Sequence, residues 1–162
     1  MTSGGTIFQY FKSDPCFKGL DIRLFFIDEK PHFEDSNVPF VYIFNTKSKR
    51  AASLKQFAHW ICLYYDGNVE KNIVFFDSLG SSPPNVLLRN ISKCGVFKSY
   101  TSANYPIQSG LSQLCGQYII VFSYLSFCVG LRFSQFLDLF SQNRIENDKR
   151  IFDIYNRIFR VV

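Results

Sequence analysis

Residues 108–118 read Gln-Ser-Gly-Leu-Ser-Gln-Leu-Cys-Gly-Gln-Tyr and place Cys115 between a polar, turn-prone segment and a long apolar run. The apolar run continues to Phe127 and has the length of a buried helix, so we expect Cys115 in its first turn. Backbone N–H groups there have no intrahelical partner, and with the helix dipole they favour a thiolate and can bind an oxyanion. The segment therefore predicts a cysteine nucleophile.

Two histidines are available as a base for this thiol. His32 lies in an acidic, turn-rich loop, where a solvent-facing imidazole is the ordinary outcome. His59 lies near the start of the apolar run 57–65, and the run 72–77 follows after an Asp-Gly-Asn turn. In the antiparallel hairpin that this predicts, His59 and Asp77 lie side by side. A carboxylate bonded to one imidazole nitrogen would leave the other facing a thiol.

Gln108 is the fourth member of the candidate site because it precedes Cys115 by seven residues. Its amide could donate to an oxyanion together with the Cys115 backbone N–H. Simpler interpretations stay open: a structural His59, an Asp77 that caps a turn, and a solvated loop glutamine. Trp60 either covers the imidazole of His59 or packs at the sheet edge.

The composition is that of a packed globule. Apolar residues make up 47% and aromatic residues 18% of the 162 residues, which predicts one domain, 1–162, with a substantial core. The net charge is +5. One basic cluster comprises Lys47, Lys49 and Arg50, and a second set on the last helix comprises Lys149, Arg150, Arg157 and Arg160. Either a solvated basic face or a contact with DNA or RNA is compatible with these clusters.

Cysteine usage favours a reducing compartment. The five cysteines are an odd number without a Cys-x-x-Cys pair, so we expect free thiols rather than a disulfide framework. The chain start lacks the pattern of a signal peptide, and we expect no metal. Residues 114–131 approach the length of a membrane span, but interspersed polar residues favour a core helix and no membrane.

The order of the expected elements predicts an α+β fold, in which a small antiparallel sheet packs against the central helix that carries Cys115. Helices are expected at 6–12 and 85–93, and strands at 21–27, 40–45, 57–65, 72–77 and 96–100. Apolar stripes mark two later helices, Phe133–Phe140 and Ile151–Phe159.

The combined pattern resembles a known family. His59-Trp60, then Phe-Phe-Asp77-Ser-Leu-Gly, then Gln108-(x)6-Cys115-Gly116 is similar in order and spacing to the adenovirus-type endopeptidases (adenain-like cysteine proteases), within the SUMO-protease-like superfamily. The upstream segments 17–23 and 41–46 also match the adenovirus-type pattern, so the resemblance covers roughly residues 7 to 130.

The resemblance implies a papain-like cysteine protease fold in circularly rearranged order, with a Cys-His-Asp triad, a glutamine oxyanion donor, and Trp60 and Gly116 in the active-site wall. It implies a monomeric maturation protease of a double-stranded DNA virus or a Polinton-like element. Such an enzyme cuts capsid and core precursors at small-residue or glycine-containing sites, in the virion and in the host nucleus or cytoplasm.

The departures from the family concern the acidic residue and the activators. Adenovirus enzymes typically have Glu where this chain has Asp77, whereas Asp is usual in the SUMO-protease branch. The C-terminal region is shorter. Adenovirus enzymes are activated by a viral peptide, disulfide-linked to a non-catalytic cysteine, and by DNA. Cys94 is either the comparable thiol or an incidental one, and Lys47, Lys49 and Arg50 are candidate DNA contacts.

Two other functions stay open. The first is a deconjugating protease that acts on SUMO or a ubiquitin-like tail ending in Gly-Gly. The second is a catalytically silent binding module, which the intact set of His59, Asp77, Gln108 and Cys115 argues against.

Overall fold

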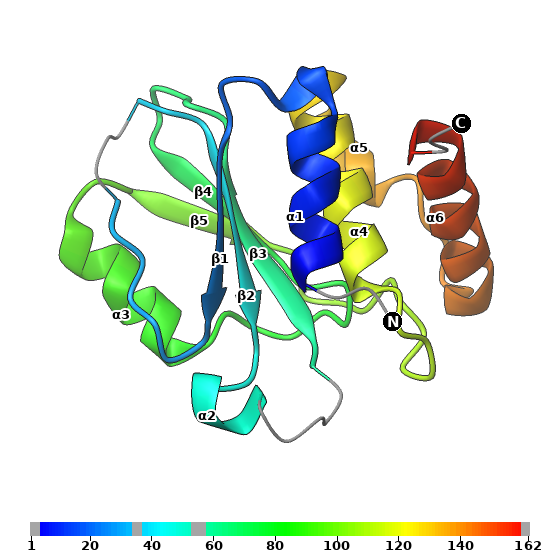
Figure 1. Cartoon of the computed structure of the whole chain (residues 1–162), viewed down its shortest axis with the longest axis horizontal. Helices are drawn as coiled ribbons and strands as arrows, with labels where there is room; N and C mark the ends of the chain where they lie inside the picture. The colour runs from blue at the N-terminus through cyan, green and yellow to red at the C-terminus, as the bar shows by residue number, and fades with distance from the viewer. Residues whose placement is uncertain (1–3, 34–36, 53–57, 160–162) are drawn as a thin grey trace. The chain divides into compact units, whose positions relative to one another are not determined.

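The computed structural model describes residues 4–33, 37–52 and 58–159. The chain divides into two compact units. A helical unit comprises residues 1–18, 78–81 and 103–162, and a sheet unit comprises residues 19–77 and 82–102 (Figure 1). The structure defines each unit by itself, so the single domain over 1–162 stays a prediction.

The sheet unit holds five strands in the order β1-β2-β3-β4-β5. Their bounds are β1 Asp21–Phe26, β2 Phe40–Asn45, β3 Trp60–Tyr65, β4 Asn72–Phe76 and β5 Ser99–Ser102. The three central strands pair antiparallel, but β1 pairs with β2, and β4 with β5, in parallel. The expectation of an antiparallel sheet was therefore wrong for both edges. The helix α3 (Asn85–Cys94) links β4 to β5, and such a crossover returns the chain in parallel.

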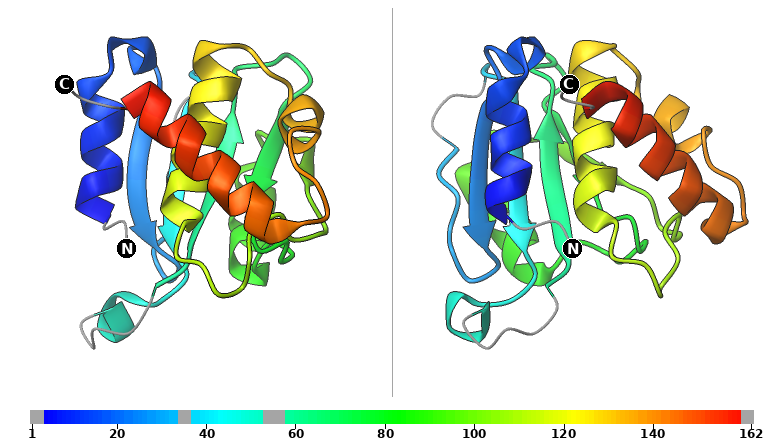
Figure 2. Two further views of the ribbon diagram at one scale, coloured as in Figure 1. Left: turned by 90° about the vertical axis from the view of Figure 1, so that its right-hand side faces the viewer. Right: turned by 45° about the vertical axis from the view of Figure 1, so that its right-hand side comes forward.

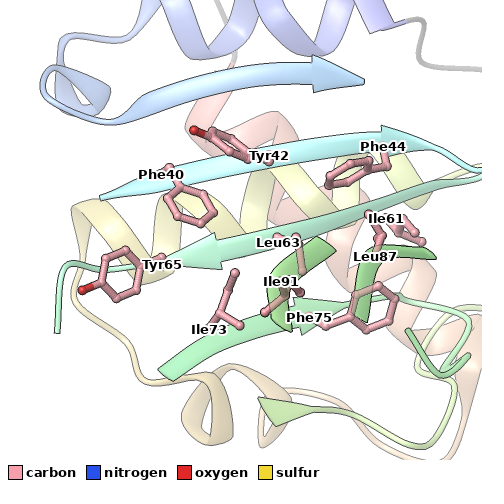
Figure 3. Packing of buried hydrophobic residues seen from close by; sticks show 10 residues of the cluster. All are labelled: Phe40, Tyr42, Phe44, Ile61, Leu63, Tyr65, Ile73, Phe75, Leu87 and Ile91. Carbon is pink, nitrogen blue, oxygen red and sulfur yellow. The ribbon is translucent and has the colours of Figure 1, made fainter. Parts of the chain in front are cut away.

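One face of the sheet carries a core of alternate residues, because side chains two apart in a strand share a face. The helix α3 contributes Leu87 and Ile91 to this core. Figure 3 shows these two side chains together with those of the three central strands: Phe40, Tyr42, Phe44, Ile61, Leu63, Tyr65, Ile73 and Phe75. Every residue of β2 and β3 is buried. His59, which directly precedes β3, is therefore attached to a well-packed strand.

The helical unit is built around α4 (Cys115–Ser123), which continues as a π-helical turn, η2 (Tyr124–Cys128). All of α4 except Gln117 is buried, as the uncharged sequence predicts for a core helix. The helices α1 (Gly4–Ser13) and α6 (Arg144–Phe159) both contact α4, and Figure 2 shows α6 crossing it. Two short elements, η1 (Pro15–Phe17) and α5 (Phe133–Leu137), complete the unit.

A disulfide joins Cys16 in η1 to Cys128 at the end of η2, with the two Cα atoms 5.8 Å apart. The expectation that all five cysteines are free was therefore wrong for this pair. The segments meet only in the tertiary structure, 112 residues apart, which no local pattern reveals. The reducing compartment itself stays a prediction.

The remaining sequence expectations differ from the structure mainly at element ends. The strand expected at 96–100 is β5 at Ser99–Ser102, and the helix expected over Phe133–Phe140 ends at Leu137. Phe57, the expected start of the third strand, lies outside the described residues. Among the residues that the structure describes, no helix is long and apolar enough to span a membrane.

Candidate active site

His59 and Asp77 form a direct pair in the sheet unit. His59 immediately precedes β3 and Asp77 immediately follows β4, and the antiparallel register Cys62–Phe76 brings these two strand ends together. His59 Nε2 lies 2.6 Å from Asp77 Oδ1. The Asp77 side chain is 2% exposed and the imidazole 22%. Because a carboxylate only accepts, Nε2 carries the shared hydrogen, and in the neutral ring Nδ1 is the basic nitrogen.

Gln108 forms the second pair, with Ser78, in the helical unit. The Ser78 carbonyl accepts from the backbone N–H groups of Ile107 (3.0 Å) and Gln108 (2.9 Å). The Ser78 hydroxyl donates to Gln108 Oε1 at 2.5 Å. Gln108 is 2% exposed, so it is not the solvated loop residue of the simpler interpretation. This clamp fixes the direction of its amide group.

The nitrogen of that amide is directed at Ser112. Gln108 Nε2 donates to the Ser112 carbonyl (3.0 Å) and to the Ser112 hydroxyl (2.9 Å). An amide nitrogen has two hydrogens, and these two acceptors occupy both. A further acceptor at Nε2 must therefore replace one of the Ser112 oxygens.

Gly80 holds the 78–81 loop close to the segment that leads to Gln108. Its φ is +72°, and a Cβ on it would lie 2.3 Å from the carbonyl carbon of Tyr105. Only glycine fits this close approach of two backbones. The Leu79-Gly80 turn is thus part of the support for Gln108.

Cys115 is the first residue of α4, as predicted, and is 7% exposed. The residue before it, Leu114, accepts from Tyr118 N–H at 2.9 Å, which begins the helix. Within the described residues, no side chain caps this helix end. Gly116 follows as a buried residue of the same turn. The placement gives the thiol a neighbouring first-turn N–H, as oxyanion binding requires.

The other free cysteines have different surroundings. Cys62 is fully buried in β3, and burial, followed by the negative charge of Asp77, raises the pKa of its thiol. Cys94 ends α3, where its sulfur donates to the Ile91 carbonyl at 2.9 Å. Cys62 is therefore held as a thiol, and Cys94 is a partly buried side chain with a local partner.

The four candidate site residues are divided between the two units. His59 and Asp77 belong to the sheet unit, and Gln108 and Cys115 belong to the helical unit. Trp60 is the buried first residue of β3, opposite Asn45. His32 is exposed, as expected.

The basic clusters are only partly accessible. Lys49 and Arg50 are exposed in the short helix α2 (Lys49–Ala52), and Lys49 lies 3.9 Å from Glu29. The ammonium group of Lys47 is buried. The DNA contact of this cluster stays a prediction. On α6, Lys149, Arg150 and Arg157 line a shallow groove together with Glu146 and Asp153. Arg160 lies outside the described residues.

Sequence reasoning did not single out several polar residues around Gln108. These residues are Ser78, Ser112, Tyr118, Asn147 and Asp148. A signal existed for two of them: Asn147 and Asp148 precede Ile151 by four and three residues, which places them on the buried stripe of the last helix. Within the described ranges, no group of three or more His, Cys, Asp or Glu side chains could hold a metal ion.

The fold is shared with solved structures of low sequence identity. Among solved structures with this fold is the pS273R protease of ASFV, at 20% sequence identity and a TM-score of 0.54. Two others are Cdu1, an effector protein of Chlamydia trachomatis bound to ubiquitin, and ChlaDub1 from Chlamydia trachomatis. Each is 15% identical, with TM-scores of 0.52 and 0.53.

Each match covers 76% of this chain, which spans 44% of the ASFV protease chain and 62% of the two Chlamydia chains. Neither a protein-family model nor a curated protein matches the sequence. The likeness therefore establishes the fold, and the adenovirus-type relationship and the circularly rearranged order stay predictions.

Proposed function

We propose that the chain is a thiol peptidase in which Cys115 is the nucleophile, His59 the base and Asp77 the carboxylate that orients the base. The His59–Asp77 pair carries the proposal. A nearly fully buried carboxylate is costly unless it is paired, and here its partner is an imidazole that keeps some exposure. This arrangement suits a proton acceptor with one fixed tautomer.

The two pairs adjoin in the sequence. Asp77, the partner of His59, and Ser78, the partner of Gln108, are consecutive residues, whose Cα atoms are about 3.8 Å apart across a trans peptide bond. Cys115 follows Gln108 by seven residues and begins α4. We propose that the imidazole, the thiol and the glutamine amide face one scissile peptide bond.

The chemistry then follows in two steps. His59 Nδ1 takes the proton of Cys115, the thiolate adds to the scissile carbonyl carbon, and the oxyanion accepts from the Cys115 N–H and from Gln108 Nε2. The tetrahedral intermediate collapses to a thioester as Nδ1–H protonates the leaving amine. A water molecule, deprotonated by Nδ1, hydrolyses the thioester and releases the acid and the thiol.

The proposed substrates are structural precursor proteins of a virus or virus-like element, cut at glycine-containing sites. The fold shared with the ASFV protease and the resemblance in residues 59–116 support this choice. A second candidate is a deconjugating protease for a ubiquitin-like protein. The fold shared with Cdu1, which is bound to ubiquitin in its structure, supports the second candidate equally.

The test compares substrates and one pair of variants. Purified protein is incubated with glycine-containing peptides from precursor proteins, and in parallel with ubiquitin and SUMO aldehydes, which trap an attacking thiol. We expect turnover or trapping in the wild type and in Cys94→Ala, and neither in Cys115→Ala with an unchanged circular dichroism spectrum. Full activity of Cys115→Ala would contradict the proposal, and the reactive probe decides between the two substrate classes.

A further inference from the structure

The helix α6 buries two consecutive polar residues, Asn147 and Asp148, which are 1% and 9% exposed. Burying a carboxylate or an amide costs free energy unless its hydrogen bonds are made inside the protein. The hydrogen-bond partners of the two side chains therefore indicate what they stabilise. Both side chains form hydrogen bonds with the segment that contains Gln108.

Asp148 holds this segment at Ser109. Its Oδ1 accepts from the Ser109 backbone N–H at 3.4 Å and from the Tyr118 hydroxyl at 3.0 Å. The Tyr118 hydroxyl also lies 3.2 Å from the Ile107 carbonyl. Burial first, and then the charge of Asp148 and its hydrogen bond, raise the pKa of Tyr118, so the phenol stays protonated and remains a donor.

Asn147 holds the same segment at Ile107. Its Nδ2 donates to the Ile107 carbonyl at 3.0 Å and to the Ser141 carbonyl at 2.8 Å. Its Oδ1 accepts from the Ser141 N–H at 2.9 Å. Asn147 therefore also fixes the turn before α6, and Asp148 is the more selective of the two for a test.

Gln108 thus lies between two residues that are both held. Ser78 binds the N–H groups of Ile107 and Gln108, and α6 binds the Ile107 carbonyl, through Asn147, and the Ser109 N–H, through Asp148. Tyr118 belongs to α4, one turn after Cys115, so the same network connects the Gln108 segment to the helix that carries the nucleophile. All of these contacts lie within the helical unit.

We propose that Asn147 and Asp148 are positioning residues, which fix the Gln108 amide relative to the Cys115 N–H so that both can donate to one oxyanion. This inference rests on the proposed peptidase function and names the support of its oxyanion site. Neither residue touches the substrate. A misplaced donor should slow the chemical step and leave ground-state binding of the substrate largely unchanged.

The first test is kinetic. Asp148→Ala removes both acceptor contacts, and we expect kcat to fall roughly tenfold to hundredfold with KM changed by less than about twofold. Asp148→Asn keeps an oxygen acceptor in place and should retain kcat within about threefold. If kcat of Asp148→Asn were as low as that of Asp148→Ala, the positioning role would be overturned, because the charge of Asp148 and not its hydrogen bonds would then matter.

A double-mutant cycle with Gln108→Ala identifies the residue through which Asp148 acts. If Asp148 works by positioning the glutamine, Asp148→Ala should lower kcat by less than about twofold in the Gln108→Ala background. An equal loss in both backgrounds would overturn the inference while the peptidase function stood. A wild type that neither cleaves nor is trapped would overturn the proposed function, and with it the catalytic part of the inference.

Amide hydrogen exchange tests, without an activity assay, whether Asp148 and Tyr118 hold the segment that contains Gln108. In Asp148→Ala, and in the milder Tyr118→Phe, exchange in the peptide that covers residues 107–112 should speed up relative to wild type, while exchange in β2 and β3 should not change. Unchanged protection of residues 107–112 in both variants would overturn the inference, whatever the substrate assays show.

Discussion

The Asp77 carboxylate oxygen lies 2.6 Å from His59 Nε2, so this contact leaves Nδ1 as the basic nitrogen of the neutral imidazole. The pair stands at the open end of the β3–β4 hairpin, and both strands are buried along most of their length. Asp77 therefore has two effects that substitutions can distinguish: its oxygen fixes the tautomer of His59, and its charge stabilises the imidazolium.

Replacing Asp77 by Asn should therefore be milder than replacing it by Ala. An amide oxygen still accepts from Nε2–H and keeps the tautomer, but it stabilises the imidazolium less. We expect kcat/KM to fall about tenfold for Asp77→Asn and at least about a hundredfold for Asp77→Ala. Steady-state kinetics of the two folded variants check this. Equal losses would show that tautomer control is not the role of Asp77.

Ser112→Ala should increase activity. The change removes one of the two acceptors that occupy Gln108 Nε2, so an oxyanion no longer displaces that hydroxyl. A net hydrogen bond is worth about 1 kcal/mol, which corresponds to an increase in kcat/KM of roughly twofold to fivefold. Ser109→Ala is the matched control, because no contact of the Ser109 hydroxyl with Gln108 is seen among the described residues. A clear loss of activity in Ser112→Ala alone would mean that Ser112 supports Gln108 rather than competing for it.

The stability of the fold should decline in alkaline solution, in part through Cys62. Its folded pKa is raised by burial and by Asp77, whereas an unfolded cysteine titrates near about 8.5. Above that pH the unfolded chain releases a proton that the folded chain keeps, so the free energy of unfolding falls as the pH rises. Urea denaturation between pH 7 and 10.5 measures the slope, which should be shallower in Cys62→Ala. A slope identical to that of the wild type would contradict the assignment.

Reduction should destabilise the protein through the Cys16–Cys128 bond. The bond closes a loop of 112 residues and ties η1 to η2 within the helical unit. Disulfides typically contribute about 2–4 kcal/mol to the free energy of unfolding. Thermal denaturation with and without dithiothreitol should show a lower midpoint for the reduced wild type and no effect of the reductant on Cys16→Ser. A midpoint that ignores the reductant in the wild type would argue against the bond in solution.

Local patterns in the sequence predicted the parts of the site that depend on neighbouring residues. The Asp-Gly-Asn turn between two apolar runs was enough to pair His59 with Asp77, and the uncharged run after Cys115 was enough to predict α4. Strand direction at the sheet edges was missed although the strand–helix–strand order over residues 72–102 already implied a parallel pair.

Long-range polar contacts could not be predicted in the same way. Ser78 and Gln108 are 30 residues apart, and Tyr118 and Asp148 are also 30 residues apart, so each pairing depends on the packing of the whole helical unit. The residues Asn147 and Asp148 look like the solvated side of a charged helix unless their spacing from Ile151 is counted. Their role becomes visible only in the structure, where each of these two buried side chains has hydrogen-bond partners.

The proposed mechanism requires His59 to withdraw the proton of Cys115, so the rate of Cys115 alkylation by iodoacetamide at neutral pH reports on this pair. We expect fast, selective labelling of Cys115 in the wild type, labelling slower by at least about tenfold in His59→Ala, and no labelling of Cys62 in either protein. Equal alkylation rates of Cys115 in the wild type and in a folded His59→Ala would contradict the proposed mechanism.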